Sequence, residues 1–177
     1  MLHRLVLLVL VVAPTVASAS EFDLSAGGGA SVVYSDPCGF PGSACTTPRM
    51  RLAGASAMLR TTWSFEKVLS PRLNLHYGPA LSGLFMTEAG GTGSIVTGGA
   101  EFGVGLDRWS LDVFGGFSWI HVGTDTMTAT GPTTAFGGGA SFALTPQLSA
   151  FARVDLSAML EGPIGGAFAG LGLTYHL

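Results

Sequence analysis

Charged residues are scarce in this 177-residue chain. Asp, Glu, Lys and Arg together make up 11% of it, and Lys67 is its single lysine. A water-exposed surface carries charge at roughly a quarter to a third of its positions, so this composition disfavours a soluble domain with a wet exterior. The basic residues are scattered and the net charge is -3, so the sequence also argues against nucleic acid as a partner.

Long apolar runs are lacking too. The longest, residues 5–13, falls short of the roughly 20 residues that a membrane-spanning helix needs, and Pro14 follows it. Arg4 precedes the run, and Ala17-Ser18-Ala19 supplies the small residues typical of a signal peptidase site. We therefore predict a secretory signal peptide over residues 1–19, with a membrane anchor as the disfavoured alternative. Residues 20–177 are expected to form a single domain.

Cysteine is almost absent. Cys38 and Cys45 are the two in the chain, and two neighbouring cysteines on an exported protein most simply form a disulfide. A metal site is the alternative, but two thiols without a nearby histidine supply too few ligands. We expect neither a metal nor another cofactor.

The chain does have a two-residue periodicity. From Leu148 to Leu160 every second residue is apolar, and the residues between them include Arg153 and Asp155. This alternation is typical of a β-strand with two different faces. Strands of soluble domains average about 5–6 residues, whereas a tilted strand needs roughly 9–11 to cross a bilayer. The segment is therefore long enough to span a membrane.

Seven other segments alternate in the same way, so that the predicted strands are 22–34, 51–65, 72–86, 94–106, 109–121, 133–145, 148–160 and 166–177. Short connections at 66–71, 107–108 and around Pro146 alternate with longer polar or Gly/Pro-rich connections. Outer-membrane barrels have short periplasmic turns and long extracellular loops, and an even strand count leaves both termini in the periplasm. We predict an all-β fold, an eight-stranded antiparallel up-and-down transmembrane β-barrel, in the bacterial outer membrane.

Aromatic residues support this orientation. Two interfacial girdles are expected, one at each rim. The girdle near the periplasmic rim would consist of Phe22, Trp63, Phe65, Trp109 and Tyr175. The girdle near the outer rim would consist of Tyr34, Phe85, Trp119 and Phe136. A soluble lipocalin-like barrel is the competing architecture, but its outer face would need many more charges. Pro79 cannot donate a ladder hydrogen bond, so we expect a bulge or an early end to pairing there.

Over nearly all of its mature length the chain resembles the small eight-stranded outer-membrane barrels of the OmpA and OmpX type. The resemblance rests on the strand alternation, the loop asymmetry and the final segment, Gly172-Leu173-Thr174-Tyr175-His176-Leu177. It implies that Gly172, Tyr175 and Leu177 form the signal read by the barrel-assembly machinery, with Leu177 in place of the usual aromatic residue. It also implies contact with outer-membrane lipid and lipopolysaccharide, and we expect a monomer.

The interior of so small a barrel is only wide enough for its side chains to fill it. Arg60, Glu101 and Arg153 each lie six residues from a predicted periplasmic turn, so we expect them at similar depth. With Asp155, and with His76 and Asp112 nearby, they would form an ion-paired plug, because buried charges persist only when paired. A structural core is the favoured interpretation and a gate is the alternative. Inward glycines leave room for a narrow water path.

A lipid-modifying outer-membrane enzyme is the less favoured function. A hydrolase needs a nucleophile, a base and an orienting acid within hydrogen-bond reach. His121 with Asp125 is the set that the sequence suggests, but the alternation turns His121 outward, and no spacing matches a catalytic motif. His76 is expected inside the barrel and His176 at its periplasmic end. We expect a non-enzymatic barrel with a structural or surface-recognition role through its extracellular loops, with a narrow porin-like channel as the alternative.

Overall fold

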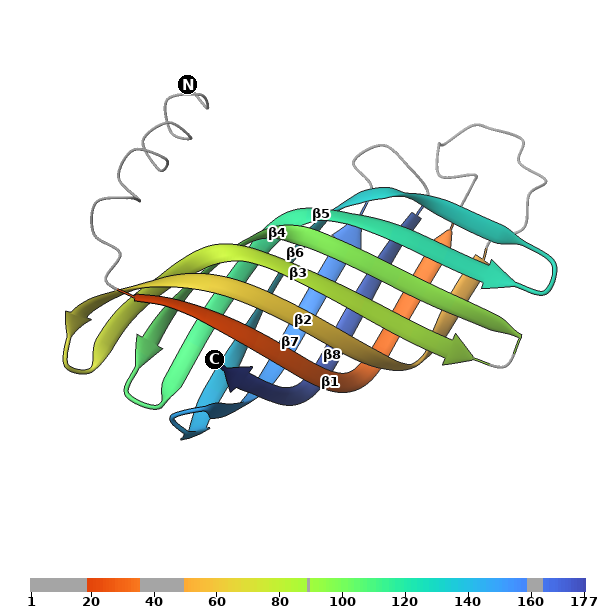
Figure 1. Cartoon of the computed structure of the whole chain (residues 1–177). Coiled ribbons are helices and arrows are strands. Elements are labelled where there is room, and N and C mark those ends of the chain that lie inside the picture. Colours follow the sequence, from red (N-terminus) through yellow and green to blue (C-terminus); the bar gives the residue numbers. More distant parts are fainter. Residues whose placement is uncertain (1–18, 36–49, 89, 159–163) are drawn as a thin grey trace, which may run out of the picture.

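The computed structural model describes residues 19–35, 50–88, 90–158 and 164–177, which form one closed sheet of eight antiparallel strands (Figure 1). Every strand pairs with its neighbours in the chain, and β8 pairs with β1 to close the barrel. The predicted fold is therefore confirmed. The strands are β1 (Ala19–Ser35), β2 (Met50–Ser70), β3 (Leu73–Glu88), β4 (Gly91–Leu106), β5 (Trp109–Thr124), β6 (Thr128–Thr145), β7 (Leu148–Ala158) and β8 (Ile164–His176).

The barrel has two different ends. At one end, which we call the turn end, the pairs Pro71–Arg72, Asp107–Arg108 and Pro146–Gln147 connect successive strands. The start of β1 and the end of β8 lie at this end as well (Figure 1). Asp107 has a φ of 53°, a left-handed conformation that aspartate tolerates in tight hairpins. β1, β3, β5 and β7 end at the opposite end of the barrel, which we call the loop end.

Two loop-end connections are shorter than predicted. β3 continues to Glu88 and β4 begins at Gly91, while β5 continues to Thr124 and β6 begins at Thr128. The predicted long connections after residues 86 and 121 are therefore wrong. These extensions are rich in Thr and Gly, and backbone pairing extends a ladder without needing alternating apolar side chains.

The region around Pro79 interrupts pairing, as one of the two predicted alternatives required, but without a bulge. Thr62 pairs with Ala80 and Phe65 pairs with Tyr77 in one unbroken register, so the expected bulge is absent from this pair of strands. Pairing with β2 lapses at Gly78 and Pro79 while pairing with β4 continues. Proline has no amide hydrogen to donate. At Gly78 a Cβ would collide with the carbonyl oxygen of Trp63.

The outward face of the described barrel is apolar. Arg51 faces outward near the loop end and Lys67 faces outward near the turn end. In the band of the barrel between these two levels, the outward positions of the described strands hold no Asp, Glu, Lys or Arg. Near the turn end, ring contacts pass from β2 to β3 and on to β4, with centroids 5.7 Å apart for Phe65–Tyr77 and 6.2 Å apart for Tyr77–Phe102. The four aromatics expected at the opposite rim are all exposed: Tyr34, Phe85, Trp119 and Phe136. No helix among the described residues is long and apolar enough to cross a membrane.

The signal peptide and the first loop fall outside this description. Residues 1–18 and residues 36–49, which contain Cys38 and Cys45, are not among the described residues. The predicted cleavage site and the predicted disulfide therefore stay predictions.

Candidate functional site

The interior of the barrel is divided into two layers. Near the turn end, inward positions carry a polar layer, which we define as Arg60, Glu101, Asp112, Arg153 and Asp155. Toward the loop end lies an apolar layer, which shares strands β2, β4 and β5 with the polar layer and is defined as Val33, Leu52, Met58, Leu84, Met86, Ile95, Ile120, Val122, Ile164 and Phe168. The boundary between the two layers crosses the strands partway along their length.

Glu101 is the centre of the polar layer. Arg60 Nη2 donates to Glu101 Oε2, and Arg153 Nη1 donates to the same oxygen at 3.0 Å. Arg153 also donates from Nη1 to Asp112 Oδ1 at 2.6 Å and from Nε to Asp155 Oδ1 at 2.8 Å. The structure thus brings together the four residues that the sequence suggested for an ion-paired cluster, and it adds Asp112 as a full member.

Phe114 is a part of this layer that sequence reasoning missed. It is Glu101's neighbour on β5, and its ring centroid lies 5.0 Å from the Arg60 guanidinium carbon and 5.7 Å from that of Arg153. The ring face attracts both cations. The signal was present, because Phe114 is a large aromatic on the polar side of the β5 alternation.

Some inward glycines make room for side chains of neighbouring strands. A Cβ at Gly103 would collide with the His76 ring, and one at Gly137 would collide with an Asp155 carboxylate oxygen. Side chains from the neighbouring strands therefore occupy the space above these glycines.

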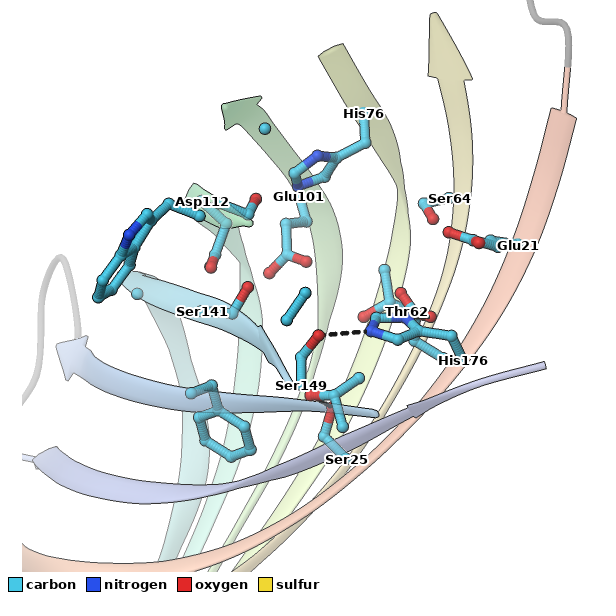
Figure 2. Close-up of a pocket in the computed structure, with 18 of the residues that line it drawn as sticks. Glu21, Ser25, Thr62, Ser64, His76, Glu101, Asp112, Ser141, Ser149 and His176 are labelled. Atoms are coloured by element: carbon cyan, nitrogen blue, oxygen red, sulfur yellow. Dashed lines mark hydrogen bonds and ion pairs between the residues drawn. The ribbon is translucent and has the colours of Figure 1, made fainter. Parts of the chain in front are cut away.

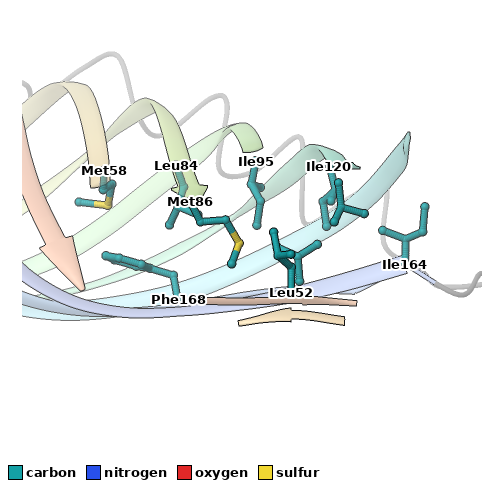
Figure 3. Packing of buried hydrophobic residues seen from close by; sticks show 10 residues of the cluster. Leu52, Met58, Leu84, Met86, Ile95, Ile120, Ile164 and Phe168 are labelled. Atoms are coloured by element: carbon teal, nitrogen blue, oxygen red, sulfur yellow. The ribbon is translucent and has the colours of Figure 1, made fainter. Parts of the chain in front are cut away.

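The apolar layer fills the interior at the loop end (Figure 3). Its members come from β1, β2, β3, β4, β5 and β8, and Val33, Ile120 and Val122 are 0% exposed. A cavity beside Met58 and Phe168 has a volume of about 20 Å³, which is room for about one water molecule. The sequence signal was the loss of polar residues from the inward side near the loop end, as at Leu84 and Met86.

A larger cavity lies on the other side of the polar layer (Figure 2). Its volume is about 320 Å³, and its lining includes the turn residues Asp107, Arg108 and Pro146, so it opens at the turn end. We call it the turn-end cavity. Its acidic residues outnumber its arginines, which gives it a negative potential: Glu21, Asp23, Glu66, Glu101, Asp107 and Asp112 against Arg60, Arg108 and Arg153.

Comparison with known proteins finds similarity in structure only. No protein-family model and no curated protein sequence matches the chain. The N-terminal β-barrel domain of Pseudomonas aeruginosa OprF aligns over 89% of this chain and 97% of its own, with a TM-score of 0.55 and 16% identity. Ail of Yersinia pestis aligns over 89% and 99%, with a TM-score of 0.51 and 15% identity. Neisserial surface protein A covers the same shares, with a TM-score of 0.50 and 10% identity.

The chain has the fold of the small eight-stranded outer-membrane barrels. At these identities the likeness concerns the fold, and function has to be argued from this chain's own residues.

The three histidines among the described residues of this outer-membrane barrel fold lie in three different environments. His76 is half-buried and lines the turn-end cavity. His121 is exposed on the outward face, as predicted, and its Nδ1 lies 2.8 Å from Thr130 Oγ1. His176 lies at the turn end between two polar partners: its Nδ1 is 2.6 Å from Asp23 Oδ1 and its Nε2 is 2.8 Å from Ser149 Oγ.

The residues of the suggested assembly signal lie at the end of the closing strand. Tyr175 and Leu177 are exposed on the outward face. Gly172 faces inward, where a Cβ would collide with the carbonyl oxygen of Ala26 on β1. Glycine at this position therefore permits close approach of β8 to β1.

Proposed function

We propose that the chain is an integral protein of the bacterial outer membrane, with its turn end in the periplasm and its loop end outside the cell. The uncharged outward face supports this placement, because a charge at the bilayer midplane costs about 2–4 kcal/mol. Aromatic belts at both ends fit the two headgroup regions. The same proposal includes export by the signal peptide and insertion by the barrel-assembly machinery. It also places both mature termini in the periplasm and has the protein contact lipid and lipopolysaccharide as a monomer.

Within that membrane the barrel acts as a closed scaffold for its extracellular loops, which carry surface recognition. The apolar layer is the observation that carries the closed lumen, since its buried side chains pack together between the polar layer and the loop end. A disulfide between Cys38 and Cys45 would restrain the first loop. A narrow porin-like channel is the second candidate, favoured by the turn-end cavity that reaches the polar layer.

Surface labelling tests the orientation. In a variant lacking Cys38 and Cys45, a cysteine placed at Thr92 or Thr126, both exposed at the loop end, should react with an impermeant thiol reagent on intact cells. A cysteine at Lys67 is the matched control and should react only after the outer membrane is opened. The reverse pattern would contradict the orientation. Gly131, which sequence reasoning placed in a loop, is buried and is unsuitable for labelling.

Planar-bilayer recording separates the scaffold from the channel. The purified full-length protein should insert and show no conductance above that of the bare bilayer. A stable, stepwise ion current from the unmodified protein would favour the channel.

A further inference from the structure

The turn-end cavity contains a Ser–His–Asp arrangement that the scaffold role does not use. Ser149 on β7, His176 on β8 and Asp23 on β1 lie on consecutive strands around the closure of the barrel. Figure 2 shows the contact between Ser149 and His176 inside the cavity. The Oγ–Nε2 distance is 2.8 Å, and the Nδ1–Oδ1 distance to Asp23 is 2.6 Å.

We propose that Ser149, His176 and Asp23 form a hydrolytic centre for small carboxylic esters. The arrangement meets two geometric requirements of such a centre, a hydrogen bond from nucleophile to base and one from base to orienting acid. Each histidine nitrogen has a separate partner, as the Ser-His-Asp template requires. Ser149 and His176 are the catalytic residues and Asp23 is a positioning residue. This activity goes beyond the scaffold role and would replace the expectation of a non-enzymatic barrel.

Neighbouring hydroxyl groups supply the remaining element. Thr174 is the cross-strand partner of Ser149, and its Oγ1 lies 2.9 Å from Ser25 Oγ on β1. Both hydroxyls line the cavity. One proton lies in the hydrogen bond between them, which leaves the other hydroxyl to donate to an oxyanion that develops beside Ser149. Hydroxyl donors aimed at such an oxygen stabilise the transition state in acyl transfer.

The reaction balances with water as the second substrate. Ser149 Oγ attacks the ester carbonyl carbon while its proton passes to His176 Nε2. The bond to the leaving alcohol breaks, and that alcohol takes the proton from His176. Water then attacks the acylated serine, gives a proton to His176 and releases the carboxylic acid, and the proton returns to Ser149.

The cavity restricts the substrate class. A volume of about 320 Å³ admits a short ester and lies at the lower end of the range for small-molecule sites. The acidic lining repels anions and attracts cations. The favoured substrates are therefore short-chain esters whose alcohol is neutral or positively charged.

Active-site labelling tests the centre in the folded full-length protein in detergent. A fluorophosphonate probe should modify Ser149, identified by mass spectrometry of the labelled peptide. Ser149→Ala should lose the label, and Ser141→Ala is the matched control, since Ser141 lines the same cavity from β6. Absence of label from folded wild-type protein, or equal labelling of Ser149→Ala, would overturn the proposal.

Ester hydrolysis gives a second readout. p-Nitrophenyl acetate and acetylcholine should be hydrolysed faster than an anionic acetate ester. His176→Asn should lower kcat at least about 100-fold, the scale of general-base catalysis, in protein that still shows folded-barrel migration on gels. Asp23→Asn should lower kcat while leaving KM unchanged, which loss of a purely structural contact would not do. Wild-type turnover that Ser149→Ala and His176→Asn leave unchanged would contradict the assignment. The possible ligand atoms of Glu21, Asp23 and His176 lie within 4.8 Å of one another, so Zn²⁺ binding there without any turnover would contradict it as well.

Discussion

The polar and apolar layers of the interior meet on the inward side of β2, β4 and β5, yet they stabilise the barrel by different physics. Arg60 and Met58 are successive inward residues of β2, and one belongs to an ion-pair network while the other belongs to an apolar core. The ion pairs stabilise the fold only as a complete set, because an orphaned buried charge is costly. Apolar packing contributes roughly in proportion to the area it buries. The depth of an inward position, and the side chains that neighbouring strands place there, therefore decide whether a charged or an apolar residue fits.

The largest expected effect comes from removing the centre of the polar layer. Glu101 is the one acidic residue in the described structure with an ion pair recorded to Arg60, whereas Arg153 keeps Asp112 and Asp155. Glu101→Gln should therefore lower the free energy of unfolding by about 3–5 kcal/mol, measured by urea unfolding in detergent. The coupling energy between Glu101 and Arg60 should be larger than that between Glu101 and Arg153.

A double-mutant cycle checks this coupling. Glu101→Gln combined with Arg60→Met removes both charges, so it should cost clearly less than the sum of the two single changes. Additivity within about 0.5 kcal/mol for both arginines would show that these residues do not act as partners.

The next effect concerns the apolar layer. Ile120 is 0% exposed, and Ile120→Ala leaves a cavity. The free energy of unfolding should therefore fall by about 3 kcal/mol. Leu111→Ala on the same strand is the control, because that side chain is exposed on the outward face and its removal leaves no internal cavity. Equal losses in urea unfolding would show that the apolar layer is not a packed core.

The smallest expected effect concerns the first loop. Mature protein should contain no free thiol. The Cys38→Ser, Cys45→Ser double variant should insert normally, and its free energy of unfolding should fall by something on the order of 2 kcal/mol. Two thiols that titrate in unreduced, membrane-extracted protein would contradict the bridge. A stability loss larger than that of Ile120→Ala would show that the loop, and not the apolar layer, holds the loop end together.

Most of the fold was predictable from the sequence because an uncharged outward face imposes a strict two-residue period. Strand ends were not, since the Gly- and Thr-rich extensions around Gly91 and Thr128 pair through backbone and carry no apolar period. The ion-paired cluster was found by counting from the turns, although β2 runs on to Ser70 and places Arg60 farther from its turn than predicted. The stagger of a closed barrel and the length of the arginine side chain still bring it to Glu101.

The Ser149–His176–Asp23 arrangement could not be predicted in this way. Asp23 and His176 are 153 residues apart in the sequence, and they meet only because β8 pairs with β1 in one particular register. No local motif marks that register. The apolar layer had a visible signal in the inward apolar residues near the loop end, but its closure across six strands depends on the tertiary arrangement.

Single-channel conductance tests most directly whether the apolar layer seals the barrel. Wild-type protein and Glu101→Gln should both remain at the level of the bare bilayer, because the apolar layer is intact in each. A variant with Met86→Ser and Ile120→Ser, in protein shown to be folded by gel migration, should conduct. Conductance in Glu101→Gln without conductance in the serine variant would contradict the account and make the ion pairs the gate.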